Sequence, residues 1–430
     1  MKVLIINTSE NEGGAAIAAS RLAEVLNRHG VEARLMVRDK HSHRPEVLTV
    51  ASSRLRRWRL QFAFLWERLV VWLSNRTRKE NLWAVDLGIG GAAVASTKAF
   101  READIIHLHW VNQGFLSLSE LRRILQSGKP VVWTMHDMWP CTAICHHARE
   151  CTLFQSHCHD CPRLLYPSAR DLSWRLFERK LKLYSRHRFT LVGCSQWIAG
   201  QARQSYLLAG QRIVSIPNTY NPRAFHPGSA DEARIHYNLP RGLRLLLFAC
   251  QKVTNERKGL RFLLDALRSE KMQRWQGRLA VVVVGQMSEE VLMRVSFPLY
   301  PLNYIDSEED MALLYQAVDL FVTPSLEENL PNTLMEAMAC GTPCVGFDIG
   351  GVPEMIDHKT NGYVARYCDA DDLADGISFV LDEKNHPALS TAAARKARAA
   401  WGEDLVAAGH IRLYNELLAT GQGTDKRKTP

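Results

Sequence analysis

Short apolar runs alternate with amphipathic helical patterns along most of this chain. The N-terminal part has an apolar run at residues 3–6, a polar loop, a helical pattern over 15–28 and a second apolar run at 31–37. Similar runs recur over 104–110, 129–135, 189–194, 212–216, 243–250, 278–284, 303–305, 317–323 and 345–347. Alternating strands and helices, with nearly continuous apolar strands, are typical of parallel sheets covered by helices on both faces. The pattern therefore predicts an α/β fold.

The regular pattern breaks at residues 217–222, whose sequence is PNTYNP. With 430 residues, the chain is long enough for two domains, each with its own hydrophobic core. We therefore expect a first domain over 1–220 and a second over 221–400. A helical pattern over 393–418 follows, and the polar end of the chain, 419–430, is expected to be a disordered tail.

Residues 324–343 carry a dense set of candidate functional groups. A loop with Glu327 and Glu328 leads into a helical pattern that contains Glu336 and ends at Gly341. The N-terminus of a helix presents free backbone N–H groups and the positive end of the helix dipole, and both favour phosphate. Two carboxylates beside such an anion site can hold the hydroxyls of a phosphorylated sugar. The alternative is a surface helix whose acids are solvated.

The motif in this stretch resembles a known signature. Glu328 and Glu336 are separated by seven residues, and Ala-Met-Ala-x-Gly-x-Pro follows over 337–343. The arrangement is similar to the signature of the family 4 retaining glycosyltransferases, and most similar to enzymes of colanic-acid and other exopolysaccharide synthesis. The resemblance implies the GT-B fold, in which two doubly wound, Rossmann-like domains face a central cleft. In that fold the last helix, here 401–418, crosses back to the first domain.

The same resemblance implies an enzyme of the hexosyltransferase class. It would move a sugar from a UDP- or GDP-sugar to a saccharide or lipid-linked acceptor, with retention at the anomeric carbon, in extracellular or surface polysaccharide synthesis. No side chain stands out as a covalent nucleophile. No catalytic metal is required, because lysines and a helix dipole carry the charge. A non-catalytic sugar-binding or scaffold protein of the same fold is the alternative.

The resemblance places the nucleotide-sugar donor mainly in the second domain. Glu336 would hold the ribose hydroxyls, and Glu328 would hold hydroxyls of the sugar ring. Lys258 matches the lysine of a Lys-Gly pair that contacts the diphosphate. The diphosphate would also contact backbone N–H groups of Leu330, Asn332 and Thr333.

One part of the family pattern is altered in this chain. Family members have Gly-Arg-Leu ahead of Lys-Gly, whereas Gln251 and Lys252 stand at that place here. Either Lys252 or Arg257 would therefore supply the second cation. Two cations beside a departing diphosphate stabilise the charge that develops in the transition state.

Candidate residues of the first domain follow its predicted strands. Gly13 and Gly14 end the loop before the first helix, where the resemblance implies that they face the donor phosphates and the acceptor. His136 follows a strand at its carboxyl end, where open α/β sheets bind ligands. The resemblance implies that His136 reaches the donor sugar, that His109 is a second histidine of the cleft, and that Asn218 faces the cleft from the linker.

Charge is concentrated in one segment. The chain has a formal net charge of +9, and residues 54–79 contain eight basic residues and one acid, Glu67. Within 54–73 arginines and tryptophans are followed by a run that is apolar nearly all round a helix. A basic, tryptophan-rich helix suits an anionic membrane surface. Packing on the sheet is the alternative, and nucleic acid is not favoured because no recognition motif accompanies the charge.

Four cysteines lie close together inside the loop over 141–161. Cys145, Cys151, Cys158 and Cys161 follow the spacing Cys-x5-Cys-x6-Cys-x2-Cys, and the sequence between them is polar. Four thiolates can surround one zinc ion, which would hold this loop in place of a hydrophobic core. Two disulfides or four free thiols are the alternatives. No secretory signal or membrane-spanning run is evident, so we expect a cytoplasmic protein at the inner face of the plasma membrane.

Overall fold

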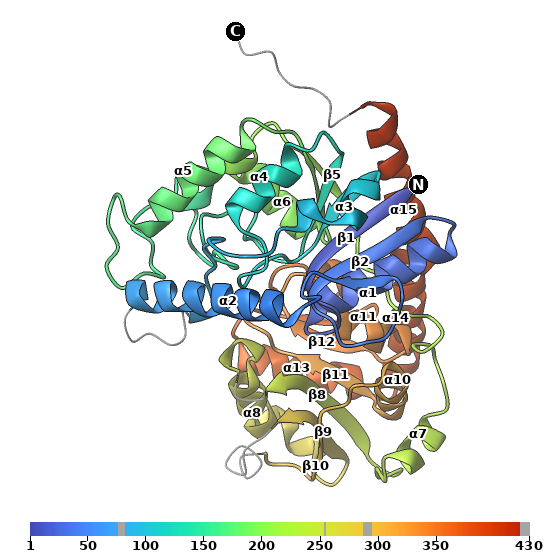
Figure 1. Cartoon of the computed structure of the whole chain (residues 1–430). Helices are drawn as coiled ribbons and strands as arrows, with labels where there is room; N and C mark the ends of the chain where they lie inside the picture. The colour runs from blue at the N-terminus through green and yellow to red at the C-terminus, as the bar shows by residue number, and fades with distance from the viewer. Residues whose placement is uncertain (76–81, 253–254, 287–294, 422–430) are drawn as a thin grey trace. The chain divides into compact units, whose positions relative to one another are not determined.

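The computed structural model describes residues 1–75, 82–252, 255–286 and 295–421 (Figure 1). The chain forms two compact units. Unit 1 comprises Met1–Asn218 together with the chain from Val406 onward, and unit 2 comprises Thr219–Leu405. Most of the predicted tail over 419–430 lies outside the described residues.

Unit 1 contains a parallel sheet of seven strands in the order β3-β2-β1-β4-β5-β6-β7. The strands are β1 (Lys2–Ser9), β2 (Glu32–Asp39), β3 (Val47–Thr49), β4 (Ile105–Leu108), β5 (Val131–Met135), β6 (Thr190–Gly193) and β7 (Arg212–Ser215). The strand order reverses between β1 and β4. Ligands of doubly wound sheets bind outside the carboxyl ends of the strands at such a switch point.

The sheet of unit 1 separates two apolar layers. Val3 and Ile5 of β1 point into one layer, together with α1 (blue in Figure 1) and α15 (red). Leu4 and Ile6 point into the other layer, together with α2, α4, α5 and α6. This alternation follows from the two-residue period of a strand and explains why residues 3–6 are apolar without a break. The helices of unit 1 are α1 (Gly14–Arg28), α2 (Arg54–Asn75), α3 (Lys98–Glu102), α4 (Leu118–Leu125), α5 (Leu172–Tyr184), α6 (Gln196–Gln204) and α15 (Glu403–Ala419).

Unit 2 repeats the plan with six parallel strands in the order β10-β9-β8-β11-β12-β13. The strands are β8 (Arg244–Lys252), β9 (Leu279–Gln286), β10 (Leu299–Leu302), β11 (Leu320–Thr323), β12 (Cys344–Phe347) and β13 (Gly362–Ala365). The helices are α7 (Ala230–His236), α8 (Leu260–Arg268), α10 (Glu308–Ala317), α11 (Asn332–Ala339), α12 (Val352–Met355), α13 (Ala370–Leu381) and α14 (His386–Trp401). Its switch point lies between β8 and β11. The prediction of two doubly wound α/β domains is confirmed.

Two predicted elements are wrong in detail. The strand expected over 303–305 is absent, and the edge strand β10 precedes it at Leu299–Leu302. Pro301 lies within β10, which is tolerated because an edge strand needs hydrogen bonds on one side only. The helical pattern over 393–418 is two helices, because the chain becomes extended at Gly402, between α14 and α15.

Candidate functional site

The first group of candidate residues lies at the carboxyl ends of β1, β4 and β5. Gly13 is the N-cap of α1 and has a φ of 88°, a conformation that disfavours other residues. A Cβ atom at Gly13 would meet nothing within 4 Å, so the backbone conformation rather than lack of space favours glycine there. Gly14 begins α1, whose first turn contains no acidic residue. The first turn of α1 therefore carries no acidic side chain that would repel an anion, and the role of Gly13 and Gly14 stays a prediction.

The structure brings His109 and His136 together in a direct hydrogen bond. His109 follows β4 and His136 follows β5, and these strands are neighbours in the sheet. His109 Nδ1 lies 2.9 Å from His136 Nε2. Burial lowers the pKa of His136 to about 4, although Asp137 acts in the opposite direction. Burial also lowers the pKa of His109, with further contributions from His107 and His136, so both rings are neutral at neutral pH.

The direction of this hydrogen bond follows from the other nitrogen of His109. That atom, Nε2, is buried and has no hydrogen-bond partner in the part of the chain that the structure describes. An unmatched lone pair is less costly to bury than an unmatched N–H group. His109 therefore carries its proton on Nδ1 and donates to His136 Nε2. The Nδ1 atom of His136 is then the protonated nitrogen of that ring.

Further buried groups extend the histidine pair towards α15. His107 of β4 contacts the Tyr414 hydroxyl through Nδ1 at 2.6 Å and Thr134 Oγ1 through Nε2 at 2.7 Å. The ring centroids of His107 and His109 lie 4.5 Å apart, and those of His107 and His410 lie 5.5 Å apart. Tyr414 and His410 were not anticipated, because no local pattern relates α15 to β4.

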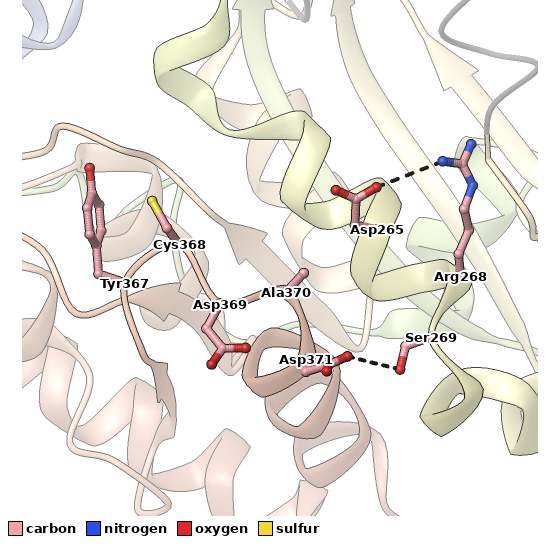
Figure 2. A pocket seen from close by; sticks show the side chains of 8 residues that line it. All are labelled: Asp265, Arg268, Ser269, Tyr367, Cys368, Asp369, Ala370 and Asp371. Atoms are coloured by element: carbon pink, nitrogen blue, oxygen red, sulfur yellow. Dashed lines mark hydrogen bonds and ion pairs between the residues drawn. The ribbon is translucent and has the colours of Figure 1, made fainter.

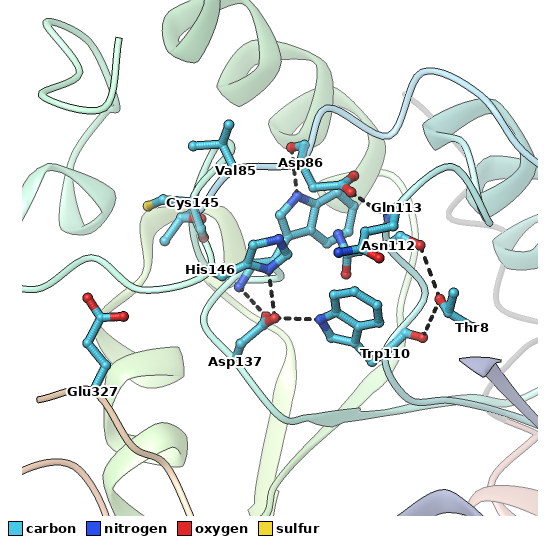
Figure 3. A network of polar contacts seen from close by, with 12 residues as sticks. Thr8, Val85, Asp86, Trp110, Asn112, Gln113, Asp137, Cys145, His146 and Glu327 are labelled. Atoms are coloured by element: carbon cyan, nitrogen blue, oxygen red, sulfur yellow. Dashed lines mark hydrogen bonds and ion pairs between the residues drawn. The ribbon is translucent and has the colours of Figure 1, made fainter. Parts of the chain in front are cut away.

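Asp137 fixes the loop that follows β4 (Figure 3). Its Oδ2 atom accepts hydrogen bonds from Trp110 Nε1 at 2.7 Å and from His146 Nδ1 at 2.7 Å. Its Oδ1 atom accepts from the Trp139 amide at 2.8 Å. Burial alone would raise the pKa of Asp137, but the contacts with His146 and Trp139 outweigh it and give a pKa of about 2. Asp137 is therefore ionised and positions Trp110.

The second group of candidate residues lies in unit 2, beside the β8–β11 switch point. Lys258 Nζ donates to Glu328 Oε1, and Arg257 forms a longer ion pair of 3.7 Å with Glu327. Lys258 and Arg257 belong to the single turn Glu256–Lys258, and both carboxylates belong to the loop after β11. The structure therefore brings together two segments that the resemblance assigns to the same donor. The side chain of Lys252, at the end of β8, lies outside the described part.

Two glycines hold the loop after β11 in place. A Cβ atom at Gly259 would lie 1.7 Å from the carbonyl oxygen of Pro324. A Cβ atom at Gly350 would lie 1.8 Å from the carbonyl oxygen of Glu328. Both glycines also have positive φ values, 69° and 58°. Only glycine permits these approaches, so the backbone on both sides fixes the position of Glu328.

The loop leads directly into α11. Its N-cap residue is Pro331, which has no side chain able to cap the helix, and no acidic residue lies in the first turn. Leu330, Asn332 and Thr333 surround this helix start, and Glu336 lies on α11 with a side chain that is largely buried.

Among the candidates of unit 1, Asn218 follows β7 as the last residue before the boundary between the units. The histidine pair belongs to unit 1, and the cation–carboxylate pairs belong to unit 2.

An open hollow of about 630 Å³ lies elsewhere on unit 2 (Figure 2). It is lined by side chains from α8 and from the segment before α13, among them Asp265, Arg268 and Tyr367. The Tyr367 hydroxyl donates to the Leu326 carbonyl oxygen at 3.3 Å, so the wall of the hollow contacts the loop after β11. Sequence reasoning did not single out this surface.

The cysteine-rich loop is held by a buried lysine. Lys180 of α5 donates to the carbonyl oxygens of Trp139 and Thr142 at 2.7 and 2.9 Å, and burial lowers its pKa to about 7. All ten cysteines are free thiols. Burial raises the pKa of Cys158 to about 12, and the thiols of Cys145, Cys151 and Cys161 add to this rise. Across the described ranges, no group of three or more ligating side chains is close enough to hold a metal ion. The zinc site stays a prediction.

Family comparisons cover most of the chain. The profile described as Glycosyltransferase Family 4 matches residues 12–223, and the profile described as Glycosyl transferases group 1 matches residues 244–383. The chain belongs to the family 4-type glycosyltransferases. The two profiles fall on the two units that carry the histidine pair and the cation–carboxylate pairs. No helix in the described part of this glycosyltransferase has the length and apolar character needed to cross a membrane.

Curated relatives match parts of this glycosyltransferase. A D-inositol 3-phosphate glycosyltransferase of Thermobispora bispora is 26% identical over 48% of this chain and 51% of its own length. The N,N'-diacetylbacillosaminyl-diphospho-undecaprenol alpha-1,3-N-acetylgalactosaminyltransferase of Campylobacter jejuni is 34% identical over 27% of this chain and 31% of its own. The chain spans about half the length, or less, of these relatives.

Solved structures match the whole of this glycosyltransferase in fold. Sucrose-phosphate synthase of Thermosynechococcus elongatus has a TM-score of 0.70 at 18% identity, over 98% of this chain and 100% of its own. The HepE protein of Anabaena, solved with UDP and glucose, has a TM-score of 0.62 at 17% identity, over 97% of this chain and 100% of its own. At these identities the likeness shows the fold alone, which is that of the GT-B glycosyltransferases.

Proposed function

We propose that this glycosyltransferase transfers a hexose from a UDP- or GDP-sugar to a saccharide acceptor carried on a lipid, with retention at the anomeric carbon. The process would be the synthesis of an extracellular or surface polysaccharide, at the inner face of the plasma membrane. The pairing of Lys258 with Glu328 beside the start of α11 carries the proposal. A cation, a carboxylate and a helix N-terminus together match the phosphates and hydroxyls of a nucleotide sugar.

The chemistry of each group follows from this pairing. Without donor, Glu328 neutralises Lys258, so neither charge is left alone in a partly enclosed loop. When a diphosphate binds, Lys258 and the N-terminus of α11 face a stronger anion, and Glu328 becomes available to accept hydrogen bonds from sugar hydroxyls. The charge on the leaving diphosphate then grows in the transition state, where the same cation stabilises it. Arg257, bound to Glu327 at 3.7 Å, would supply the second cation.

The proposed division of work assigns the acceptor, and the orientation of the donor sugar through His136, to unit 1. His136 is neutral and is held by His109, so it can donate a hydrogen bond to a sugar hydroxyl without carrying charge. The Anabaena protein was solved with UDP and glucose, and the printed name of the Campylobacter relative describes a diphospho-undecaprenol saccharide. These names support a nucleotide sugar and a lipid-linked saccharide as the classes to test.

The proposal is tested by incubating the purified protein with a panel of UDP- and GDP-sugars and following nucleotide release. For the donor that turns over, NMR of the first product gives the anomeric configuration. We expect release from at least one donor and a product with the configuration of the donor. A protein that binds a donor without releasing nucleotide would favour the non-catalytic alternative, whereas inversion at the anomeric carbon would contradict the retaining reaction.

A further inference from the structure

Helix α2 exposes a continuous apolar stripe. Leu55, Trp58, Phe62, Leu65, Leu69 and Trp72 follow one another at alternating spacings of three and four residues, so they lie on one helix face. Each has between 44% and 71% of its surface exposed, and Trp66 and Leu73 beside them are exposed as well. We call these eight residues the α2 face. Single exposed apolar residues are ordinary, but a stripe of eight is a marker of an interaction surface.

The opposite side of α2 is attached to unit 1 by two buried ionisable residues, and burial raises the pKa of one of them, Glu67, to about 8. Glu67 is fully buried and accepts hydrogen bonds from the amides of Leu87 and Gly88 at 2.8 and 2.7 Å. Arg68 donates to the Val85 carbonyl oxygen at 3.2 Å and lies 3.4 Å from Asp86. A helix that only covered the sheet would bury its tryptophans and expose this pair, because burying ionisable groups is costly. The inverted arrangement leaves the apolar residues for another partner.

Close packing fixes the rotation of α2 about its axis. A Cβ atom at Gly114 would lie 2.7 Å from Phe64 Cα, and one at Gly90 would lie 3.0 Å from Ala63 Cβ. Leu60 and Val71 of α2 are buried in the core of unit 1. The helix cannot turn its apolar stripe inward without breaking these contacts. The packing of α2 on unit 1 therefore keeps the α2 face exposed.

The charges on α2 indicate an anionic partner. Arg54, Arg56, Arg57 and Arg59 are exposed at its N-terminal end, and its one acid, Glu67, is buried. The dipole of a helix favours acids at this end, so the arginines do not serve the stability of the helix. All exposed charge on the described part of this helix is positive.

We propose that the α2 face docks on an anionic lipid surface, with the helix lying in the plane of the interface. The tryptophans and leucines would enter the boundary between headgroups and acyl chains, and the arginines would contact lipid phosphates. The helix has 22 residues and is about 33 Å long at 1.5 Å per residue. It cannot cross a bilayer, because Glu67 and Arg68 bind its other side to unit 1.

A second copy of the chain fits this face less well. The three-four spacing would suit a coiled coil. In a parallel pair, however, the four arginines would face four arginines, and in an antiparallel pair they would face residues 69–75, where there is no acid. Neither arrangement gives the arginines a partner of opposite charge. A surface of lipid phosphates does.

A chain of hydrogen bonds connects α2 to the candidate site of unit 1. Asp86, which faces Arg68, accepts a hydrogen bond from the Gln113 amide at 2.5 Å, and its carbonyl oxygen accepts from Trp139 Nε1 at 2.9 Å (Figure 3). Gln113 belongs to the loop that Asp137 fixes through Trp110. The inference deepens the membrane location of the proposed function, but lipid binding itself requires no turnover.

The test is co-sedimentation of the full chain with vesicles of phosphatidylcholine alone and of phosphatidylcholine mixed with phosphatidylglycerol. We expect binding to the mixed vesicles, weakened by salt. The double variant Trp58→Glu, Phe62→Glu should lose about tenfold or more in affinity. Leu405→Glu is the matched control, because Leu405 is 54% exposed at the start of α15 and should bind as the wild type does. Thermal unfolding of each variant checks that the fold is retained.

A second variant separates charge from apolar insertion. Replacing the four arginines by glutamine should remove the preference for phosphatidylglycerol, at about fivefold per arginine at low salt. Equal binding of wild type and Trp58→Glu, Phe62→Glu would overturn the proposal. So would a wild-type dimer without lipid that this double variant dissociates, since a second copy would then cover the face. Nucleotide release measured without vesicles should be unchanged in these variants, so a failure of docking and a failure of the proposed function are distinguishable.

Discussion

His109 Nδ1 lies 2.9 Å from His136 Nε2, and both rings are neutral. The contact gives His136 a fixed orientation, since its ring has a partner at one nitrogen and lies at the end of β5. His109 is in turn packed against His107, with ring centroids 4.5 Å apart. We infer that His109 is a positioning residue for His136.

Replacing His109 by phenylalanine keeps a ring of similar size and removes the hydrogen bond. We expect kcat to fall about tenfold with little change in the KM for the donor, because a loosely held His136 is misplaced only during reaction. His109→Asn should recover much of the loss, since its amide reaches the position of Nδ1. A steady-state comparison of the three proteins tests this. Equal kcat in wild type and His109→Phe would contradict the positioning role.

Stability should fall as the solution is acidified below pH 6.5. Burial lowers the pKa of His410 to about 4, whereas in the unfolded chain it is near 6.5. Between these values the unfolded state binds more protons than the folded state, so the free energy of unfolding rises with pH across this window. The loss from His410 alone is about 2 kcal/mol at pH 5. Urea unfolding at pH 7 and pH 5 measures it.

Two comparisons sharpen the pH experiment. The variant His410→Leu should show a smaller difference between pH 7 and pH 5 than the wild type, even if it is less stable at both. Asp137, with a pKa of about 2, contributes in a different range: its stabilisation is present above the ordinary carboxyl pKa and is lost as the pH falls towards 2. An unchanged free energy of unfolding between pH 7 and pH 5 would contradict the burial of neutral histidines.

Two glycines with nearly the same φ value give a matched pair of alanine substitutions. Gly259 (φ 69°) has no room for a Cβ, which would lie 1.7 Å from the Pro324 carbonyl oxygen, whereas Gly277 (φ 71°) has nothing within 4 Å. Gly277→Ala should cost about 1 kcal/mol, the conformational term alone. Gly259→Ala should cost more than about 3 kcal/mol because the loop must move. Similar melting temperatures for the two variants would show that Gly259 does not hold the loop after β11 in place.

The carboxyl ends of these strands could be predicted from the sequence, because polar residues follow each apolar run, directly in the case of His136 and five residues later in the case of Glu328. The contact between His107 and Tyr414 could not, since the residues are 307 positions apart and neither lies in a distinctive pattern. The orientation of α2 on the sheet could not be predicted from the sequence either. Part of its sequence is apolar nearly all round, and the buried pair Glu67 and Arg68 decides which side faces the sheet. Edge strand β10 was missed because Pro301 argues against a strand.

Cys145, Cys151, Cys158 and Cys161 of the loop over 141–161 lead to a prediction about the zinc content of the purified protein. If their thiols converge on zinc, protein purified under reducing conditions should contain about one zinc ion per chain. Cys158→Ser should lose the metal, and Cys368→Ser, outside the loop, should keep it. Metal analysis by mass spectrometry after mild chelation is the measurement. Wild-type protein without zinc would end the zinc hypothesis and leave Lys180 as the main anchor of the loop.

The pairing of Lys258 with Glu328 is the central claim, and nucleotide release from the preferred donor tests it most directly. Wild type is compared with Glu328→Ala, Lys258→Met and the control Glu383→Ala, whose exposed carboxylate pairs with Arg278 away from the loop. We predict that kcat falls about 100-fold or more in the first two variants, with an intact fold, and stays at the wild-type value in the control. Release by Glu328→Ala at the wild-type rate, or no release by the wild type from any donor, would contradict the account.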